Sequence, residues 1–114
     1  RVQGREHDSA IEMKDTALQI QEAGADLLLL ECVPATLAAE ISQLLHIPVI
    51  GIGAGSDCDG QILVLQDMLG ITTGRPPSFS RNFLLDHGSI EESISAYVTE
   101  VKNKSFPEAS HCFS

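Results

Sequence analysis

A single carboxylate follows the most apolar run of the chain, and it is the first side chain to consider for chemistry. Residues 27–30 are four consecutive leucines, Glu31 comes next, and Pro34 turns the chain three residues later. The run predicts a short strand that is buried on both faces. Charged residues at the carboxyl ends of buried parallel strands are where α/β folds keep their catalytic groups. Glu31 is therefore the first candidate for catalysis.

Two roles for Glu31 are open from the pattern alone. As a general base or metal ligand it would be partly withdrawn from water by its own apolar strand, which makes a carboxylate a stronger base near neutral pH. Alternatively, it caps a neighbouring helix or pairs with a surface lysine. The adjacent Cys32 is expected to point to the opposite side and to act as a small buried apolar side chain, because no histidine stands near it in the sequence to activate a thiol.

The second candidate is the glycine-rich segment 51–55, with the sequence Gly-Ile-Gly-Ala-Gly. Glycine lets backbone N–H groups approach an anion closely, so Gly51 and Gly53 are candidates for substrate binding. The spacing is not that of the dinucleotide fingerprint. A tight turn against which a neighbouring segment packs is the favoured alternative.

The other acidic and imidazole side chains give no metal-binding pattern. Asp57 and Asp59 are expected to cap the start of a helix, because oxygen-ligand metal sites need more carboxylates than these two supply. His7, His87 and His111 have no partner at the i, i+4 spacing of a helical metal site. We therefore predict no metal ligand within this chain.

The elements that must position these residues alternate between helix and strand. Apolar periodicity predicts the following order: helix 9–22, strand 27–31, helix 35–45, strand 48–52, a helix or a helix followed by a short strand at 61–69, loop 70–78 and helix 89–102. Asp8 or Ser9 is expected to cap the first helix, and Gly24 to end it. Ser89 is expected to cap the last helix in a capping box with Glu92.

This alternation predicts a parallel sheet and an α/β fold. Strands this short and apolar suit a (βα) barrel or a doubly wound sheet. A barrel needs eight βα units and about 250 residues, whereas this chain has 114 residues and supplies two or three units. We expect a single domain over 1–114 that is either a small open sheet or a piece of a larger fold.

The composition of the chain limits the classes of molecule that it is expected to bind. The net charge is −9, from 16 acidic and 7 basic residues, which argues against nucleic acid and anionic membrane surfaces. No apolar run is long enough to span a bilayer. The cysteines, Cys32, Cys58 and Cys112, are odd in number and widely spaced, so reduced thiols in a cytoplasmic protein are expected.

Several motifs, taken in order, resemble those of the ketopantoate hydroxymethyltransferase family. The likeness is densest at residues 47–55 and 59–64, after L-E-C-V-P at 30–34. E-C-V-P combined with G-I-G-A-G-x-x-x-D-G-Q is far more specific than either motif alone. Weaker matches are the N-terminal R-V-Q-G-R, then D-M-L-G at 67–70, P-S-F at 77–79 and a diverged tail in which Ser110 and Cys112 replace the family's residues.

The resemblance implies a (βα)8 barrel, of which this chain would be the C-terminal portion with about strands 6–8 and their helices. The N-terminal half of the barrel would be absent from this chain and would be its partner. The implied protein is usually a large homo-oligomer. Its activity is transfer of a hydroxymethyl group from 5,10-methylenetetrahydrofolate to 3-methyl-2-oxobutanoate (α-ketoisovalerate), giving ketopantoate in pantothenate biosynthesis.

The resemblance also assigns roles. Glu31 matches the family's proton acceptor, which removes the C3 proton of the ketoacid while Mg²⁺ on the ketoacid oxygens stabilises the enolate. The magnesium ligands and a substrate-binding lysine would lie on earlier strands, so the chain alone is predicted to be inactive. Two alternatives stay open: a non-catalytic half-barrel that needs a partner chain, and a different barrel enzyme that binds phosphate at Gly51–Gly55.

Overall fold

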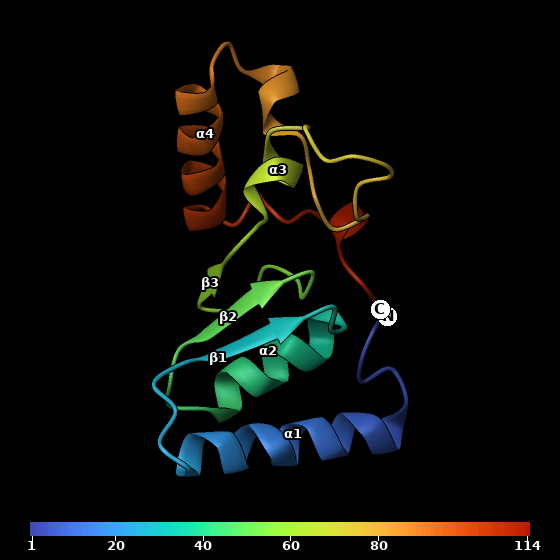
Figure 1. Cartoon of the computed structure of the whole chain (residues 1–114). Coiled ribbons are helices and arrows are strands. Elements are labelled where there is room, and N and C mark those ends of the chain that lie inside the picture. The colour runs from blue at the N-terminus through green and yellow to red at the C-terminus, as the bar shows by residue number, and fades with distance from the viewer.

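The computed structural model describes all 114 residues, which form an elongated molecule of 44 × 25 × 22 Å. Helices and strands alternate along most of the chain (Figure 1). None of the helices combines the length and the apolar character that a membrane span requires. The elements are α1 (His7–Glu22), β1 (Leu28–Glu31), α2 (Ala35–Leu44), β2 (Val49–Ile52), β3 (Gly60–Gln61), α3 (Leu65–Met68), the 3-10 turn η1 (Phe83–Asp86), α4 (Ile90–Lys102) and the 3-10 turn η2 (Ala109–His111).

The strands form one parallel sheet in the order β1-β2-β3, which confirms the predicted parallel α/β arrangement. In the register of β1 and β2, Leu28 lies opposite Val49 and Glu31 lies opposite Ile52. The two strands therefore end level with each other. Glu31 and the glycine-rich turn consequently share one edge of the sheet.

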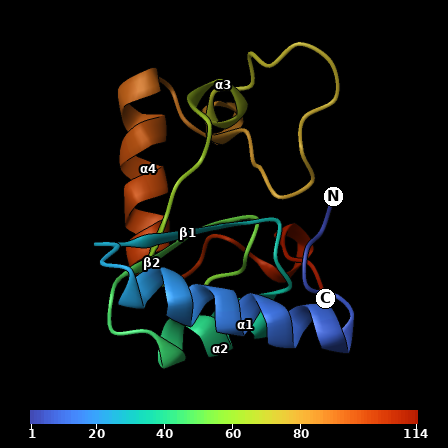
Figure 2. The ribbon, with the colours of Figure 1, turned by 60° about the horizontal axis from the view of Figure 1, so that its bottom comes forward.

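One face of the sheet is covered by α1 and α2, which lie together on that side of β1 and β2 (Figure 2). The centre of this layer is inaccessible to solvent at Ala38, Ile41 and Val49. Burial of these apolar side chains is the main source of stability here. The cluster as a whole comprises Ala17, Leu28, Leu30, Val33, Leu37, Ala38, Ile41, Leu45, Val49, Ala54 and Cys58.

The other face of β1 is open, so the prediction of a strand buried on both faces is wrong for this chain. Leu28 and Leu30 are buried, whereas Leu27 and Leu29 are 55% and 49% exposed. Side chains alternate between the faces of a strand, and α1 and α2 cover only one of them. Leu29 and Glu31 consequently share the uncovered face.

The segment 61–69 forms a strand before a helix, not the predicted helix or helix followed by a strand. Gly60 and Gln61 pair with Ile50 and Gly51 of β2, and the Ile62 N–H donates to the Gly51 carbonyl at 3.0 Å. These bonds join residues about ten positions apart, so no local pattern reveals them. The helix α3 begins only at Leu65.

The start of α1 also differs from the prediction. Its N-cap residue is Glu6, and no side chain caps the helix. The Ser9 hydroxyl donates to the Glu6 carbonyl at 3.0 Å, and Asp8 lies within the first turn. Neither residue is the predicted cap. At the other end, Gly24 has a φ of 101° directly beyond the helix, as predicted.

A second core lies between α3, η1 and α4, and aromatic rings dominate it. Phe83 has no exposed surface and meets Tyr97 and Phe106 edge-to-face, with ring centroids 5.5 and 5.3 Å apart. Met68 completes the buried set. Edge-to-face pairs stabilise such clusters by about 0.5–1.5 kcal/mol beyond their buried area.

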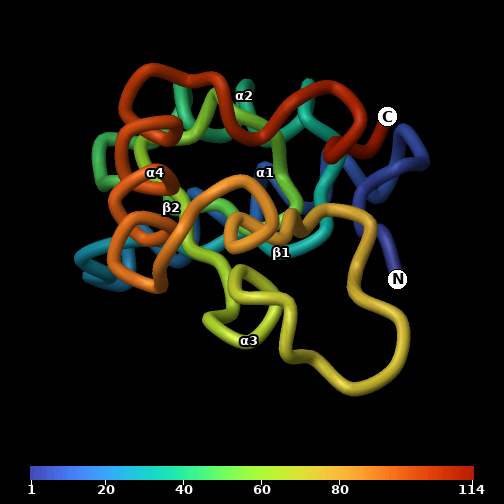
Figure 3. The backbone as a smooth tube through the Cα atoms, turned by 90° about the horizontal axis from the view of Figure 1, so that it is seen from above, coloured from blue at the N-terminus to red at the C-terminus, as the bar shows by residue number.

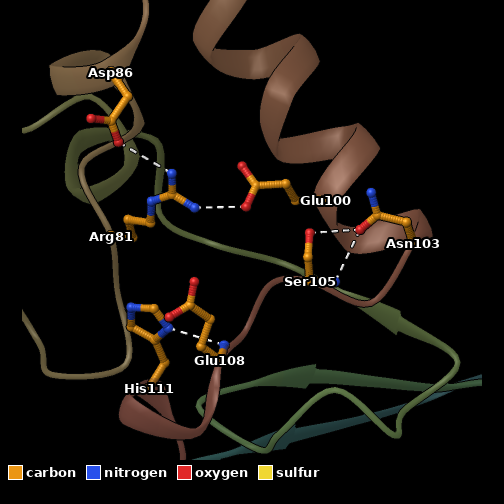
Figure 4. Close-up of polar contacts among 7 residues, drawn as sticks. All are labelled: Arg81, Asp86, Glu100, Asn103, Ser105, Glu108 and His111. Carbon is orange, nitrogen blue, oxygen red and sulfur yellow. Dashed lines mark hydrogen bonds and ion pairs between the residues drawn. The ribbon is translucent and has the colours of Figure 1, made fainter.

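Arg81 joins this core to α4 (Figure 4). Its guanidinium lies 4.5 Å from the centre of the Phe83 ring and donates to Glu100 at 2.7 Å and to Asp86 at 3.2 Å. Burial lowers the pKa of Arg81, but its hydrogen bonds to the two carboxylates outweigh this and raise it. The 81–86 segment is therefore fixed to α4 by charge as well as by packing.

Ser89 caps α4, as predicted, but the predicted capping box with Glu92 is not completed, because the Glu92 carboxylate does not accept from the Ser89 N–H. The Ser89 hydroxyl accepts from the Glu92 N–H at 3.1 Å, and the Glu92 carboxylate accepts from the Gly88 N–H at 2.9 Å. Ser93 is fully buried. Among the apolar residues of this helix, Tyr97 and Val101 pack against the aromatic core, whereas three others lie outside it and are exposed: Ile90, Ile94 and Val98.

Tyr97 provides a test of the aromatic core. Its hydroxyl is buried without a hydrogen-bond partner, and burial raises the pKa of Tyr97. The folded chain therefore keeps this phenol neutral at pH values where the unfolded chain ionises, and stability falls as the pH rises above about 10. We expect Tyr97→Phe to be at least as stable as the parent near pH 7 and to lose less stability above pH about 10. Denaturant unfolding at both pH values measures this, and a variant clearly less stable near pH 7 would contradict it.

Candidate active-site edge

Glu31 is the last residue of β1 and lies at the edge where β1 and β2 end. Its side chain is exposed on the uncovered face, so the expected partial withdrawal from water does not occur within this chain. The carboxylate takes part in none of the chain's ion pairs and none of its side-chain hydrogen bonds. It neither caps a helix nor pairs with a lysine. Its proton-accepting lone pairs are uncommitted.

Immediately after Glu31 the backbone enters an unusual conformation. Cys32 has a φ of 54°, a left-handed value that costs a non-glycine residue about 1–3 kcal/mol. Its N–H donates to the Ile52 carbonyl at 3.0 Å, and its carbonyl accepts from the Gln3 N–H at 2.8 Å. The strand therefore stops at Glu31, and Cys32 is half-buried instead of continuing the strand as a buried side chain. Strained residues that their surroundings hold in place are concentrated at functional sites.

The predicted substrate-binding glycines have a packing role in the structure. A Cβ on Gly51 would lie 2.9 Å from the Cys58 Sγ, and a Cβ on Gly53 would lie 2.9 Å from the Phe79 ring. Gly53 also has a φ of 65°. Both glycines are buried. The tight-turn alternative accounts for them, and a direct contact of Gly51 or Gly53 with substrate remains a prediction.

Two segments far apart in sequence complete this edge, and both were missed as site-building elements. The rings of Phe79 and Phe113 meet edge-to-face at 6.5 Å beside Gly53, and the Phe113 carbonyl accepts from the Ala35 N–H at 3.0 Å. Both termini lie on the same side of the molecule (Figure 3). Each ring belongs to a motif recognised in the sequence, P-S-F and the tail, but nothing local indicates that the two motifs meet.

Asp57 and Asp59 do not begin a helix, so the prediction that they act as caps is wrong. The Asp59 carboxylate accepts from the Val49 N–H at 2.8 Å and fixes the start of β2, while Asp57 lies 3.7 Å from the Lys104 Nζ. The chain at this point turns into β3. No set of three or more His, Cys, Asp or Glu side chains is arranged to hold a metal ion. The residues of this chain therefore do not by themselves fit a magnesium site.

Comparison with known proteins identifies relatives of the chain. A sequence model of the family described as ketopantoate hydroxymethyltransferase matches residues 1–109. Proteins named 3-methyl-2-oxobutanoate hydroxymethyltransferase from Alkalilimnicola ehrlichii and Marinobacter nauticus are 61% and 58% identical to the chain over 113 residues. These residues make up 99% of the chain but 41% and 43% of the two relatives, so the chain spans about two fifths of their length. Since the match runs through Glu31, the strained turn and the glycine-rich segment, the chain belongs to the ketopantoate hydroxymethyltransferase family.

Proposed function

We propose that this chain is the part of a 3-methyl-2-oxobutanoate hydroxymethyltransferase that carries the catalytic base. The reaction transfers a hydroxymethyl group from 5,10-methylenetetrahydrofolate to 3-methyl-2-oxobutanoate and yields ketopantoate for pantothenate biosynthesis. The observation that carries the proposal is the uncommitted carboxylate of Glu31, held at the end of a parallel strand on the face that the helices leave open. The family of the chain supplies the reaction.

Glu31 would act on the carbon next to the ketone. Its carboxylate takes the C3 proton of the ketoacid, and the released electron pair is delocalised onto the C2 carbonyl as an enolate. The one-carbon unit is bonded to two nitrogens of the folate. The enolate carbon forms a bond to this unit as the first carbon–nitrogen bond breaks, and water supplies the oxygen of the new hydroxyl as the second one breaks. The proton taken by Glu31 and one proton of the water pass to the two nitrogens. The expected magnesium ion would have its ligands outside this chain, because the residues present do not provide them.

The rest of the catalytic domain would cover the open face. We propose that β1, β2 and β3 are about strands 6–8 of a (βα)8 barrel, with α1 and α2 on its outer wall. Support comes from the parallel strand order and from the exposed apolar residues Leu29, Ile62 and Val64, which a barrel interior would bury. A homo-oligomeric state and a cytoplasmic location belong to the same proposal.

The test uses a completed chain, in which a relative supplies the part of the barrel that this chain lacks. In the completed chain, this sequence replaces the segment that it matches in the Alkalilimnicola ehrlichii protein, to which it is 61% identical. We expect the completed chain to form ketopantoate from both substrates with Mg²⁺, and this chain alone to form none. The unmodified relative is the positive control. A folded completed chain that forms no ketopantoate would contradict the proposed function, and activity of this chain alone would contradict its dependence on a second half.

A further inference from the structure

A polar pocket of about 270 Å³ opens beyond α3, in the part of the chain between residues 67 and 82. Four polar side chains line it, and residues 70, 74 and 76 supply two glycines and a proline. No large apolar side chain and no Lys, Arg or His lines it. The four side chains are those of Asp67, Thr72, Ser80 and Asn82. None of them has a role in the proton transfer proposed above.

The two hydroxyl groups of the pocket already donate hydrogen bonds within the chain. The Thr72 hydroxyl donates to Asp67 Oδ1, and the Ser80 hydroxyl donates to the Pro77 carbonyl at 2.8 Å. A hydroxyl whose O–H donates one hydrogen bond can still accept another through the lone pairs of its oxygen. Both groups therefore offer acceptors to anything that enters the pocket.

Asp67 strengthens this acceptor character. The residue is 8% exposed, and only its Oδ1 accepts a hydrogen bond from a side chain. A nearly buried carboxylate is stabilised by further N–H donors, and Oδ2 has none from the protein. Asn82 supplies the one donor that remains, because its Oδ1 already accepts from the Leu84 N–H at 3.0 Å while its amide N–H groups are uncommitted.

This inventory selects the chemistry of the ligand. Acceptors outnumber donors and a carboxylate is among them, so phosphate and other anions are disfavoured. A single carboxylate is too few for a hard divalent cation. The volume suits one ring system and is below that of a pocket for a drug-sized molecule. What fits is a small ligand with adjacent N–H donors for Asp67 and one carbonyl for Asn82.

The pocket is attached to the catalytic edge of the sheet. Phe79 lies between two residues that line the pocket, Pro76 and Ser80, and its ring packs beside Gly53 at the end of β2. A ligand in the pocket is therefore held by the same loop that packs against Gly53, at the edge where β1 and β2 end.

We propose that the pocket binds the 2-amino-4-oxopyrimidine edge of a pterin, with Asp67 accepting from the ring N–H and the 2-amino group. On the proposed function, which this inference deepens, the ligand is the pterin end of the one-carbon donor. The arrangement resembles a carboxylate that binds a guanidinium through two parallel N–H bonds. Asn82 donates to the ring carbonyl.

The experiment compares two ring systems that differ in one group. Pterin itself carries the 2-amino donor, and lumazine has a carbonyl at that position. Binding of each to the completed chain is followed by fluorescence titration. We expect pterin to bind at least about tenfold more tightly than lumazine, and Asp67→Asn to remove this preference. Asp57→Asn, at an exposed carboxylate outside the pocket, is the matched control and is expected to retain it.

Equal binding of pterin and lumazine to the parent would overturn the inference without any variant, so a poorly folding Asp67→Asn protein does not decide the matter. A preference that survives in folded Asp67→Asn would overturn it as well. Exchange of the C3 proton of the ketoacid requires Glu31 and no pterin. Loss of exchange with the pterin preference retained would therefore count against the proposed function alone, and exchange without the preference against the pocket alone.

Discussion

Exchange of the C3 proton of 3-methyl-2-oxobutanoate with solvent is expected to fall by about 10²- to 10⁴-fold when Glu31 is replaced by glutamine in the completed chain. Glutamine has nearly the same shape as glutamate, but its amide is not a base. The Glu31 carboxylate accepts no hydrogen bond from another side chain, so the substitution breaks no contact of this chain. Proton NMR of the ketoacid in deuterated buffer with Mg²⁺ measures the exchange and needs no folate.

Two further measurements make the Glu31→Gln result specific. Binding of the ketoacid, followed by calorimetry, is expected to change little, because the base acts on the bound substrate. Glu12→Gln, at an exposed carboxylate on α1, is the matched control and is expected to exchange at the parent rate. Parent-like exchange in Glu31→Gln would remove this residue from the mechanism, and the proposal would lose the observation that carries it.

Phe83→Ala is expected to lower the free energy of unfolding of the completed chain by about 3–5 kcal/mol. The side chain has no exposed surface and lies at the centre of the aromatic core, in contact with Tyr97 and Phe106. Its removal leaves a cavity that these two rings can fill only in part. It also removes the ring over which the Arg81 guanidinium lies. Unfolding in urea, followed by circular dichroism, measures the loss.

Leu85→Ala is the matched control for Phe83→Ala. Leu85 belongs to the same 3-10 turn but is 81% exposed, and its truncation is expected to change the free energy of unfolding by no more than about 0.5 kcal/mol. Similar small losses for both variants would show that residues 83–106 do not form a packed core. Exposure, not position in the turn, is what separates the two expectations.

The first half of the chain was predictable because its signals are local. The helices α1 and α2 and the strands β1 and β2 follow from apolar spacing, and Gly24 marks the end of α1 as predicted. The strand β3 was not predictable in the same way. Two residues, Gly60 and Gln61, become a strand only because β2 lies beside them.

The candidate site also combines features that local sequence signals predict with features that depend on distant contacts. The place of Glu31 at a strand end follows from the leucine run before it. Its exposure does not follow, because exposure depends on what covers the second face of the sheet. The left-handed Cys32 had no signal either, since such conformations are expected of glycine and asparagine. Nor did the sequence reveal that Asp59 serves a strand and not a helix.

The contact between Phe113 and the start of α2 links the timing of synthesis to the geometry of the edge. Pro34 offers no side-chain cap, and the Ala35 N–H donates to the Phe113 carbonyl, which leaves the ribosome long after α2 does. Until residue 113 is made, the first turn of α2 and the loop that joins it to Glu31 lack this hydrogen bond. A chain synthesised only as far as residue 112 would therefore hold the first turn of α2 and the loop after Glu31 less firmly than one that includes Phe113.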